Sequence, residues 1–453
     1  MQGGPTPVPT PVMDALVEFV LDLDFESLPP AVVEAAGRSI TDWLGTALRG
    51  AGEPLAAAIA AVIGAAGGEA QATVVGRRQR TSVLFAALAN GAQSHALDFD
   101  DTHLPSIVHG SAPVAPVMLA LGEWHRLSGA RSLAAFVAGF EVETRIGRIL
   151  GRKLADRGWH VTGLLGHFGA AAAAGKLLDL DAGRLAHALG VAATQAAGLE
   201  ESFGTMSKPL HPGKAAMNGL LAALLAREGY TGSTAVLDGA HGLPATFLGV
   251  TDLSGAVEDL GKRWEILENS TKLYAACHLT HATIDAGRAI RSRVAGSGEA
   301  IESVRCRVHP LVLKVANQTA PRSGLEAKFS VAYCAATALV RGEASEAEFS
   351  DARVEDAAVA RVMARVTPEA DASLGVGAAL MTVRMADGRV VEERVAAASG
   401  TAENPPSREA VESKFRRLAA VRLSADRVEG LASALRRLAD LPDVGQLARL
   451  AAG

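Results

Sequence analysis

The stretch of sequence that decides the fold is residues 163–178, GLLGHFGAAAAAGKLL. It is apolar almost all round, whereas a helix on a protein surface carries one apolar stripe and one polar face. The pattern therefore predicts a central buried helix. The small Ala and Gly side chains would let neighbouring helices approach it closely.

The chain on both sides of this segment has a helical pattern, with apolar residues at spacings of three and four and Gly or Pro at the ends. Examples are residues 31–48, 82–95, 112–127, 132–150 and 185–199. We therefore predict a helical domain over residues 1–270.

The pattern changes after about residue 270. Val304, Cys306 and Val308 alternate with polar residues, which indicates a strand, and an Asp-Gly turn at 387–388 predicts a hairpin. Further segments of this region are the two hairpin strands and two helices, at 380–385, 390–395, 327–341 and 354–365. We predict a smaller α+β domain over 271–400, after which 401–453 return to the helical domain. The predicted fold class is mainly α.

Composition narrows the class of protein. A chain of 453 residues with 49% hydrophobic and 21% charged residues is globular and long enough for two lobes. A net charge of -5 gives no reason to expect nucleic acid. The sequence has three scattered cysteines, shows no export signal and has no apolar run long enough to span a membrane. We therefore predict a cytoplasmic protein without a membrane partner.

The chemistry is concentrated in residues 90–109, NGAQSHALDFDDTHLPSIVH, which hold three carboxylates and three imidazoles within an apolar region. Burying such groups is costly unless they are paired. Three interpretations are open: a structural polar network, an aspartate-rich metal site, or a metal-free acid/base site facing a carboxylate substrate. The spacing is not DDxxD, and the position beside Pro105 and Gly110 favours a loop at a cleft. The third interpretation therefore leads.

Further candidates lie elsewhere in the chain. Lys208 stands in GTMSKPLHPG, and only nine of the 44 basic residues are lysines, so a lysine there suggests a compact point charge. An ordinary exposed lysine is the alternative. Lys272 is a candidate anion ligand, His160 precedes the central helix, and Tyr333 lies on a predicted helix among small residues. For His160 and Tyr333, a packed core side chain is the alternative.

Cys277, His278 and His281 could suggest zinc, but no further Cys/His pair with zinc-finger spacing exists. The chain also lacks the GxxxxGK[ST], GxGxxG, HExxH and GxSxG motifs. Their absence disfavours NTPases, Rossmann dehydrogenases, zincins and α/β-hydrolases.

These residues resemble the MmgE/PrpD family, which contains 2-methylcitrate dehydratase, cis-aconitate decarboxylase and iminodisuccinate epimerase. The resemblance extends over nearly the whole chain. Its most specific motifs are LDFDDTH at 97–103 and KPLHPGKAA at 208–216, with further matches at 41–45, 159–163, 272–273 and 404–407. It implies a large all-helical domain, a smaller α+β lid, and assembly as a homodimer.

The resemblance also implies a set of site residues for the decarboxylase branch. It places catalytic residues at Asp98, His109, Lys208 and Tyr333, and substrate-binding residues at Thr102, His160 and Lys272. His103 is added as a further substrate-binding candidate. No metal and no organic cofactor are implied.

We therefore expect a cofactor-independent lyase, a carboxy-lyase or a hydro-lyase, acting on a small di- or tricarboxylic acid. In the expected mechanism the lysines and His160 hold the substrate carboxylates, and a carbanion forms at the carbon α to a carboxylate. His109 would move the proton, Asp98 would orient that imidazole, and Tyr333 would donate from the lid. Asp100, Asp101 and His95 are expected to have scaffold roles.

Two alternatives remain open. The chain could be an isomerase, an epimerase of an amino- or imino-dicarboxylate such as iminodisuccinate, since that reaction also begins with a carbanion. In another class, it could be a non-catalytic helical protein that binds a metabolite.

Overall fold

The computed structural model describes residues 11–294 and 300–453, which form two compact units. The helical unit comprises the described residues up to Ala96, together with Asp100–Asn269 and Val411–Gly453. The second unit comprises Leu97–Phe99 and the described part of Ser270–Ala410. Among the described residues, strands longer than two residues occur only in the second unit. The predicted fold class, mainly α with a smaller α+β part, is confirmed.

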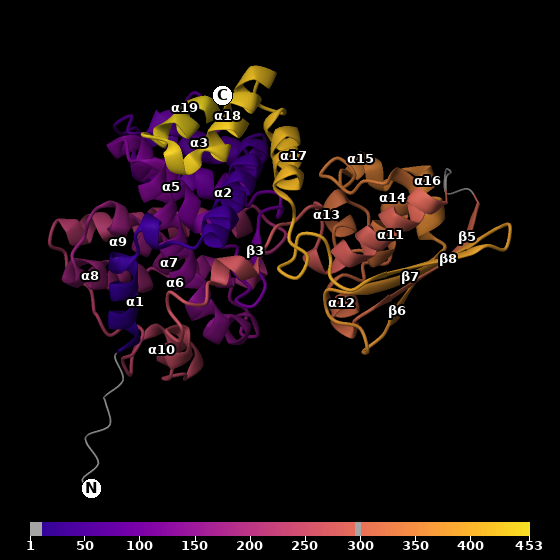
Figure 1. Cartoon of the computed structure of the whole chain (residues 1–453), viewed down its shortest axis with the longest axis horizontal. Coiled ribbons are helices and arrows are strands. Elements are labelled where there is room, and N and C mark those ends of the chain that lie inside the picture. Colours follow the sequence, from indigo (N-terminus) through magenta and orange to yellow (C-terminus); the bar gives the residue numbers. More distant parts are fainter. Residues whose placement is uncertain (1–10, 295–299) are drawn as a thin grey trace, which may run out of the picture. The chain divides into compact units, whose positions relative to one another are not determined.

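Helices are the main regular structure of the helical unit (Figure 1). They are α1 (Val12–Asp22), α2 (Pro30–Gly50), α3 (Pro54–Ala66), α4 (Val83–Ser94), α5 (Ser111–His125), α6 (Gly129–Ala155), α7 (Val161–Leu177), α8 (Ala182–Ala193), α9 (Ser207–Arg227), α10 (Leu243–Leu248), α17 (Arg408–Ala419), α18 (Ala425–Arg436) and α19 (Gly445–Ala451). Short antiparallel strands β1 (Ala72–Thr73) and β2 (Arg80–Thr81) pair with each other, and β3 (Thr102–His103) lies in the loop after α4.

The predicted central helix is α7. Every residue of α7 except Lys176 is buried, and the helix packs against α5, α6, α8 and α9. The Lys176 ammonium donates to the carbonyl of Val20 at 2.7 Å, which satisfies the one charged group of the helix. An all-apolar helix thus lies where its sequence requires, inside the unit.

Two glycines of α9 set how closely this helix approaches α4 and α7. A Cβ at Gly213 would lie 2.4 Å from the carbonyl oxygen of Leu88, and a Cβ at Gly219 would lie 2.5 Å from Cβ of Ala170. Both distances are far inside van der Waals contact, so only glycine fits. These contacts fix the N-terminal part of α9, which carries Lys208.

The second unit is built on a sheet with the strand order β6-β5-β7-β8. Its elements are β4 (Asn269–Ser270, which begins at the last residue of the helical unit), α11 (His281–Arg293), β5 (Ile301–Val308), α12 (Pro310–Val315), α13 (Gly324–Ala327), α14 (Val331–Arg341), α15 (Asp351–Val354), α16 (Ala357–Met363), β6 (Val366–Ala370), β7 (Ala379–Met385) and β8 (Val390–Val395).

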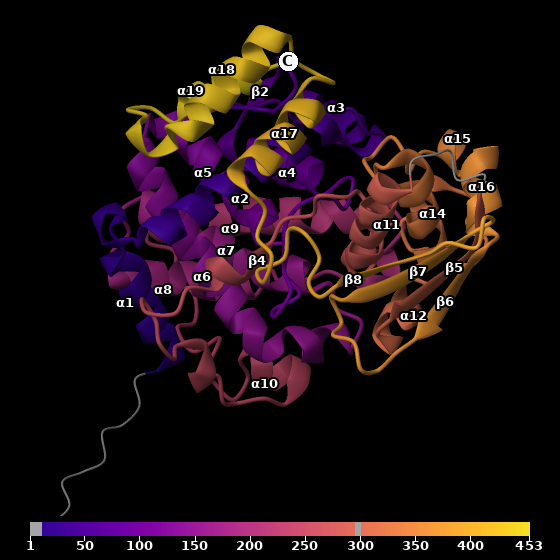
Figure 2. The same cartoon turned by 45° about the vertical axis from the view of Figure 1, so that its right-hand side comes forward.

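Pairing in this sheet is parallel for β5 with β6 and antiparallel for β5 with β7 and for β7 with β8. The predicted hairpin is β7–β8, and Gly388 takes a φ of 85° at its turn. Helices α11 and α14 pack on the sheet, α11 against β7 and β8 and α14 against β6 (Figure 2).

Among the described residues, no single helix is both long and apolar enough to cross a membrane. Helices α2 and α3 meet the length and composition limits only as a pair, with a bend of 83° at the break.

A buried ion pair joins α17 to α2. The Lys414 ammonium lies 2.6 Å from Oδ1 of Asp42, and the two side chains are 2% and 0% exposed. Burial is the largest influence on Asp42 and raises the pKa of its carboxyl to about 7, although Lys414 opposes the shift. Removing either partner would leave the other without its counter-charge in the core, which would destabilise the fold.

We predict that Lys414→Met lowers the free energy of unfolding by about 3–5 kcal/mol, because it leaves a buried carboxyl without its cation. Urea denaturation followed by circular dichroism measures the change. Lys153→Met, at an exposed position of α6, is the matched control and should change stability by less than about 0.5 kcal/mol. Equal stability of the two variants would contradict the prediction.

Candidate active site

The acid/base cluster of the helical unit lies where helices α4, α7 and α9 adjoin the loop before α5. His95 caps the C-terminal end of α4, and His160 caps the N-terminal end of α7. The backbone N–H of His109 donates to Oγ1 of Thr162 at 3.0 Å, which ties the loop to the first turn of α7. Helix ends carry unpaired backbone groups, so polar side chains are readily accommodated there.

The centre of this cluster is the carboxylate of Asp100, which is fully buried. His95 Nδ1 lies 2.8 Å from Asp100 Oδ2 and 3.0 Å from Oδ1, and His109 Nδ1 lies 3.4 Å from Oδ2. Thr102 Oγ1 is 3.4 Å from the same nitrogen of His109. One carboxylate therefore orients two imidazoles.

Burial alone would raise the pKa of Asp100, but His95 and His109 hold it well below its ordinary value. Burial lowers the pKa of His95 to about 4, against the attraction of Asp100. Asp100 is thus ionised and His95 neutral at neutral pH. A neutral His95 that donates from Nδ1 to Asp100 keeps a lone pair on Nε2.

A second group of residues adjoins His95. The His160 ring stacks on His95 with centroids 5.6 Å apart, and His160 Nδ1 lies 2.9 Å from His211 Nδ1. Phe203 meets the His160 ring edge-on at 5.2 Å, and the Lys208 ammonium lies 5.2 Å from the centroid of the Phe203 ring. The helical unit thus brings Thr102, His109, His160 and Lys208 of the predicted site together, and adds His95, Asp100 and His211.

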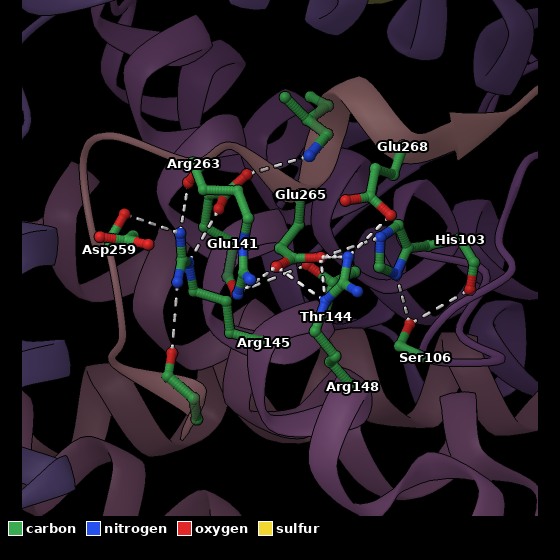
Figure 3. Close-up of polar contacts among 12 residues, drawn as sticks. His103, Ser106, Glu141, Thr144, Arg145, Arg148, Asp259, Arg263, Glu265 and Glu268 are labelled. Carbon is green, nitrogen blue, oxygen red and sulfur yellow. Dashed lines mark hydrogen bonds and ion pairs between the residues drawn. The ribbon is translucent and has the colours of Figure 1, made fainter. Parts of the chain in front are cut away.

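His103 is also buried, but protein groups engage both of its ring nitrogens. Its Nδ1 lies 2.8 Å from the Ser106 hydroxyl, and its Nε2 lies 3.2 Å from Oε2 of Glu265 (Figure 3). Arg148 reaches that same oxygen of Glu265 at 2.6 Å and Oε2 of Glu268 at 2.7 Å. These contacts favour a structural role for His103.

Arg145 extends this network along the chain before Glu265. It pairs with Glu141 at 3.0 Å and donates to the carbonyl of Arg263 (Figure 3). It also donates to the carbonyl of Glu258 at 2.8 Å. Burial would raise the pKa of Glu265, yet hydrogen bonds from His103 and Arg148 lower it to about 2. The network anchors residues 258–268 and the His103 end of the loop to α6.

Asp101 has a scaffold position. Its carboxylate accepts from the Ser111 hydroxyl, from the Ser111 backbone at 3.3 Å and from the Asn269 amide at 2.7 Å. Burial nevertheless raises its pKa. Through Ser111 it holds the first residue of α5.

Asp98, expected to orient His109, belongs to the second unit. The Lys272 ammonium donates to the Asp98 carbonyl at 2.7 Å and lies 3.3 Å from its carboxylate. Asp98 has a φ of 52°, a left-handed conformation in which asparagine and aspartate are enriched. In the helical unit, the carboxylate of Asp100, for which we expected a scaffold role, lies 3.4 Å from His109 Nδ1.

Tyr333 lies in the core of the second unit. Its hydroxyl donates to the carbonyl of Glu348 at 2.6 Å, and its ring packs against Phe349 with centroids 5.7 Å apart. Burial raises the pKa of this phenol to about 12. A phenol has one proton to donate, and here that proton is already engaged.

Two groups of side chains in the helical unit have the ligand types of a metal site. His95, Asp100 and His109 offer ligand atoms within 4.8 Å of one another, as do His103, Glu265 and Glu268. In the second group, Arg148 already neutralises the carboxylates. In the first, the 2.8 Å separation of His95 Nδ1 and Asp100 is a hydrogen-bond distance, which favours a proton between these atoms.

The sequence interpretation gave Asp100 and His95 scaffold roles, and the division of roles within the cluster stays a prediction. It did not single out His211. The signal was present, since His95 and Asp100 lie in the 90–109 stretch and His211 in the KPLHPG motif. Spacing alone does not say in which direction the three neighbouring aspartate side chains point, because the loop backbone decides it.

Comparison with known proteins agrees with this arrangement of two units. Residues 14–255 match the MmgE/PrpD N-terminal domain and residues 274–440 the MmgE/PrpD C-terminal domain. The chain is 28% identical to the cis-aconitate decarboxylase of Mus musculus over 461 residues, covering 98% of this chain and 93% of that protein. It is 30% identical to the cis-aconitate decarboxylase of Aspergillus terreus (strain NIH 2624 / FGSC A1156), covering 95% and 94%. The chain belongs to the MmgE/PrpD family.

Proposed function

We propose that this protein is a lyase that removes CO₂ from a small tricarboxylic acid of the cis-aconitate type. The observation that carries the proposal is the buried Asp100 carboxylate with two imidazoles on it and Lys208 nearby. Relatives named cis-aconitate decarboxylase that align over more than nine-tenths of the chain support the choice of substrate.

The reaction needs a place for negative charge. When the bond to the departing carboxylate breaks, its electron pair stays on the substrate carbon and must be stabilised until a proton arrives. Lys208 supplies a fixed cation, and neutral His160 supplies a ring N–H for a substrate carboxylate. His160 is buried, so little solvent screens its interaction with developing charge, whereas Lys208 is partly exposed.

His109 then protonates the carbanion. Its Nδ1 faces Asp100 and Thr102, which fixes the ring and leaves Nε2 for the substrate. Asp100 stabilises the imidazolium form in the way a buried carboxylate does in other acid/base dyads. His95 shares that carboxylate and limits how far His109 can turn.

Three predicted residues, Asp98, Lys272 and Tyr333, are part of the second unit. Their contribution to catalysis stays a prediction, as does assembly into a homodimer. Dehydration of a 2-methylcitrate-like acid and epimerisation of iminodisuccinate remain the alternatives, because each begins with a carbanion of the same kind.

The test is nuclear magnetic resonance of purified protein with cis-aconitate, 2-methylcitrate and iminodisuccinate, each in D₂O. We expect CO₂ release and one solvent deuteron per product molecule with cis-aconitate alone. Water loss from 2-methylcitrate, or deuterium exchange without CO₂ release from iminodisuccinate, would replace the proposal by the corresponding alternative. No reaction with any of the three would refute it.

We predict that Asp100→Asn lowers kcat by about 10²–10⁴, because the amide neither fixes the two imidazole tautomers nor stabilises an imidazolium. Steady-state kinetics and a urea denaturation curve separate catalysis from folding. Asp179→Asn, at an exposed position after α7, is the control. A folded Asp100→Asn enzyme with more than half of the wild-type kcat would rule out this role.

Lys208→Met is expected to lower kcat/KM by about 10- to 150-fold, the equivalent of one charge-assisted hydrogen bond. Methionine keeps the length and apolar stem of lysine, so the loss isolates the charge. Lys153→Met serves as the control. Partial recovery in Lys208→Arg would support an electrostatic role, whereas unchanged kinetics in Lys208→Met would remove this residue from the site.

Dialysis against EDTA is expected to leave turnover unchanged, because the 2.8 Å distance between His95 Nδ1 and Asp100 Oδ2 favours a hydrogen bond over a bound metal between them. Activity before and after dialysis is compared with the metal content from mass spectrometry. Loss of activity that a divalent cation restores would favour a metal at His95, Asp100 and His109.

A further inference from the structure

Phe203 lies between two groups of the proposed site, the His160 imidazole and the Lys208 ammonium. Its ring makes a T-shaped contact with the His160 ring, with centroids 5.2 Å apart and planes at 90°. The Lys208 Nζ atom lies over the Phe203 ring, 5.2 Å from its centroid. Phe203 is 45% exposed, so it gains less from burial than a core phenylalanine does. These two contacts are therefore the distinctive feature of its position.

The turn after Phe203 connects its ring to the start of α9. Gly204 has a φ of 81°, a left-handed conformation that glycine adopts without strain. The Thr205 hydroxyl donates to the carbonyl of Ser202 at 2.7 Å and accepts from the backbone N–H of Ser207 at 3.1 Å. Because Ser207 is the first residue of α9, these bonds fix the start of the helix relative to the ring.

Backbone hydrogen bonds also hold the segment before Phe203 against the start of α7. The N–H of His160 donates to the carbonyl of Gly198 at 3.0 Å, and the N–H of Glu200 donates to the carbonyl of Gly158 at 2.8 Å. The N–H of Phe203 in turn donates to the carbonyl of Glu200 at 2.8 Å. The backbone therefore sets the position of the Phe203 ring relative to both the imidazole and the helix that carries the lysine.

The contact with the ring has a useful electrostatic property. The face of an aromatic ring carries partial negative charge and attracts a cation within about 6 Å of its centroid. The Lys208 ammonium lies within that range. A carboxylate neutralises the lysine that it holds, as Asp42 does for Lys414. An aromatic ring attracts an ammonium without cancelling its charge, so an anion can still bind to that cation.

We propose that Phe203 is a positioning residue, whose ring face holds the Lys208 ammonium beside His160 for a substrate carboxylate. The inference rests on the proposed function, in which both groups bind carboxylates of the substrate. A lysine side chain is flexible, and fixing it on binding costs conformational entropy. Because the ring restricts the ammonium before the substrate arrives, less of that entropy is lost on binding.

The kinetic test compares Phe203→Leu with Phe203→Tyr. Leucine keeps apolar bulk but has no ring face, so kcat/KM for cis-aconitate should fall about 3- to 30-fold, the range of a cation–π contact. Tyrosine keeps the ring face and should retain more than about half of the wild-type kcat/KM. Tyr230→Leu, at an exposed aromatic residue beyond the end of α9, is the matched control. Circular dichroism checks that each variant is folded.

A double-mutant cycle separates positioning of the lysine from support of the loop. In the Lys208→Met background there is no ammonium to position, so adding Phe203→Leu should lower kcat/KM by less than about 2-fold. An equal loss in both backgrounds would overturn the inference, because the ring would then act independently of the lysine. Wild-type kcat/KM in Phe203→Leu would overturn it as well.

Proton magnetic resonance gives a readout without substrate. An aromatic ring shifts the resonances of protons above its face upfield, and the signals of the Lys208 ε-methylene are identified by their loss in Lys208→Met. We expect an upfield shift in the wild type that persists in Phe203→Tyr and disappears in Phe203→Leu. A wild type without this shift would refute the inference whatever its activity. A wild type that shows the shift but does not turn over cis-aconitate would refute the proposed function instead.

Discussion

The arrangement of the helical unit depends on one electrostatic constraint, the ionised carboxylate of Asp100 inside an alanine-rich core. A buried carboxylate needs nearby hydrogen-bond donors, because removing it from water costs a large desolvation free energy. His95 and His109 meet it, and in doing so they become fixed in orientation. The contacts that compensate for the buried charge therefore also fix the orientation of two imidazoles.

The surrounding structure holds these groups at hydrogen-bonding distance. Close glycine contacts bring α9 against α4 and α7, which fixes the part of α9 that bears Lys208 and His211. On the other side, His103 is locked by Ser106 and Glu265, and Arg148 balances that glutamate. Rigid support of this kind lets a site present preorganised dipoles and charges.

Much of the fold could be predicted from periodicity. The all-apolar segment that became α7, and the alternating pattern with an Asp-Gly turn that became the β7–β8 hairpin, are local signals read directly from side-chain spacing. Part of the site could be predicted as well, since Thr102, His109, His160 and Lys208 lie together in the helical unit. The contacts of Asp98, Asp100 and His95 could not, because the direction of neighbouring loop side chains depends on the loop backbone and not on their spacing. Asp98 takes a positive φ and pairs with Lys272, and the Asp100 carboxylate lies 2.8 Å from His95 Nδ1 and 3.4 Å from His109 Nδ1.

The sequence by itself determined the family, the mainly helical class and the segments in which the chemistry is concentrated, because periodicity and motif spacing are local properties of the chain. Tertiary structure decided which groups are partners. His160 and His211 are 51 positions apart, and Glu265 lies far along the chain from His103. Hydrogen bonds and ion pairs at such separations depend on helix packing to within an ångström, and no spacing of residues along one chain encodes that distance directly.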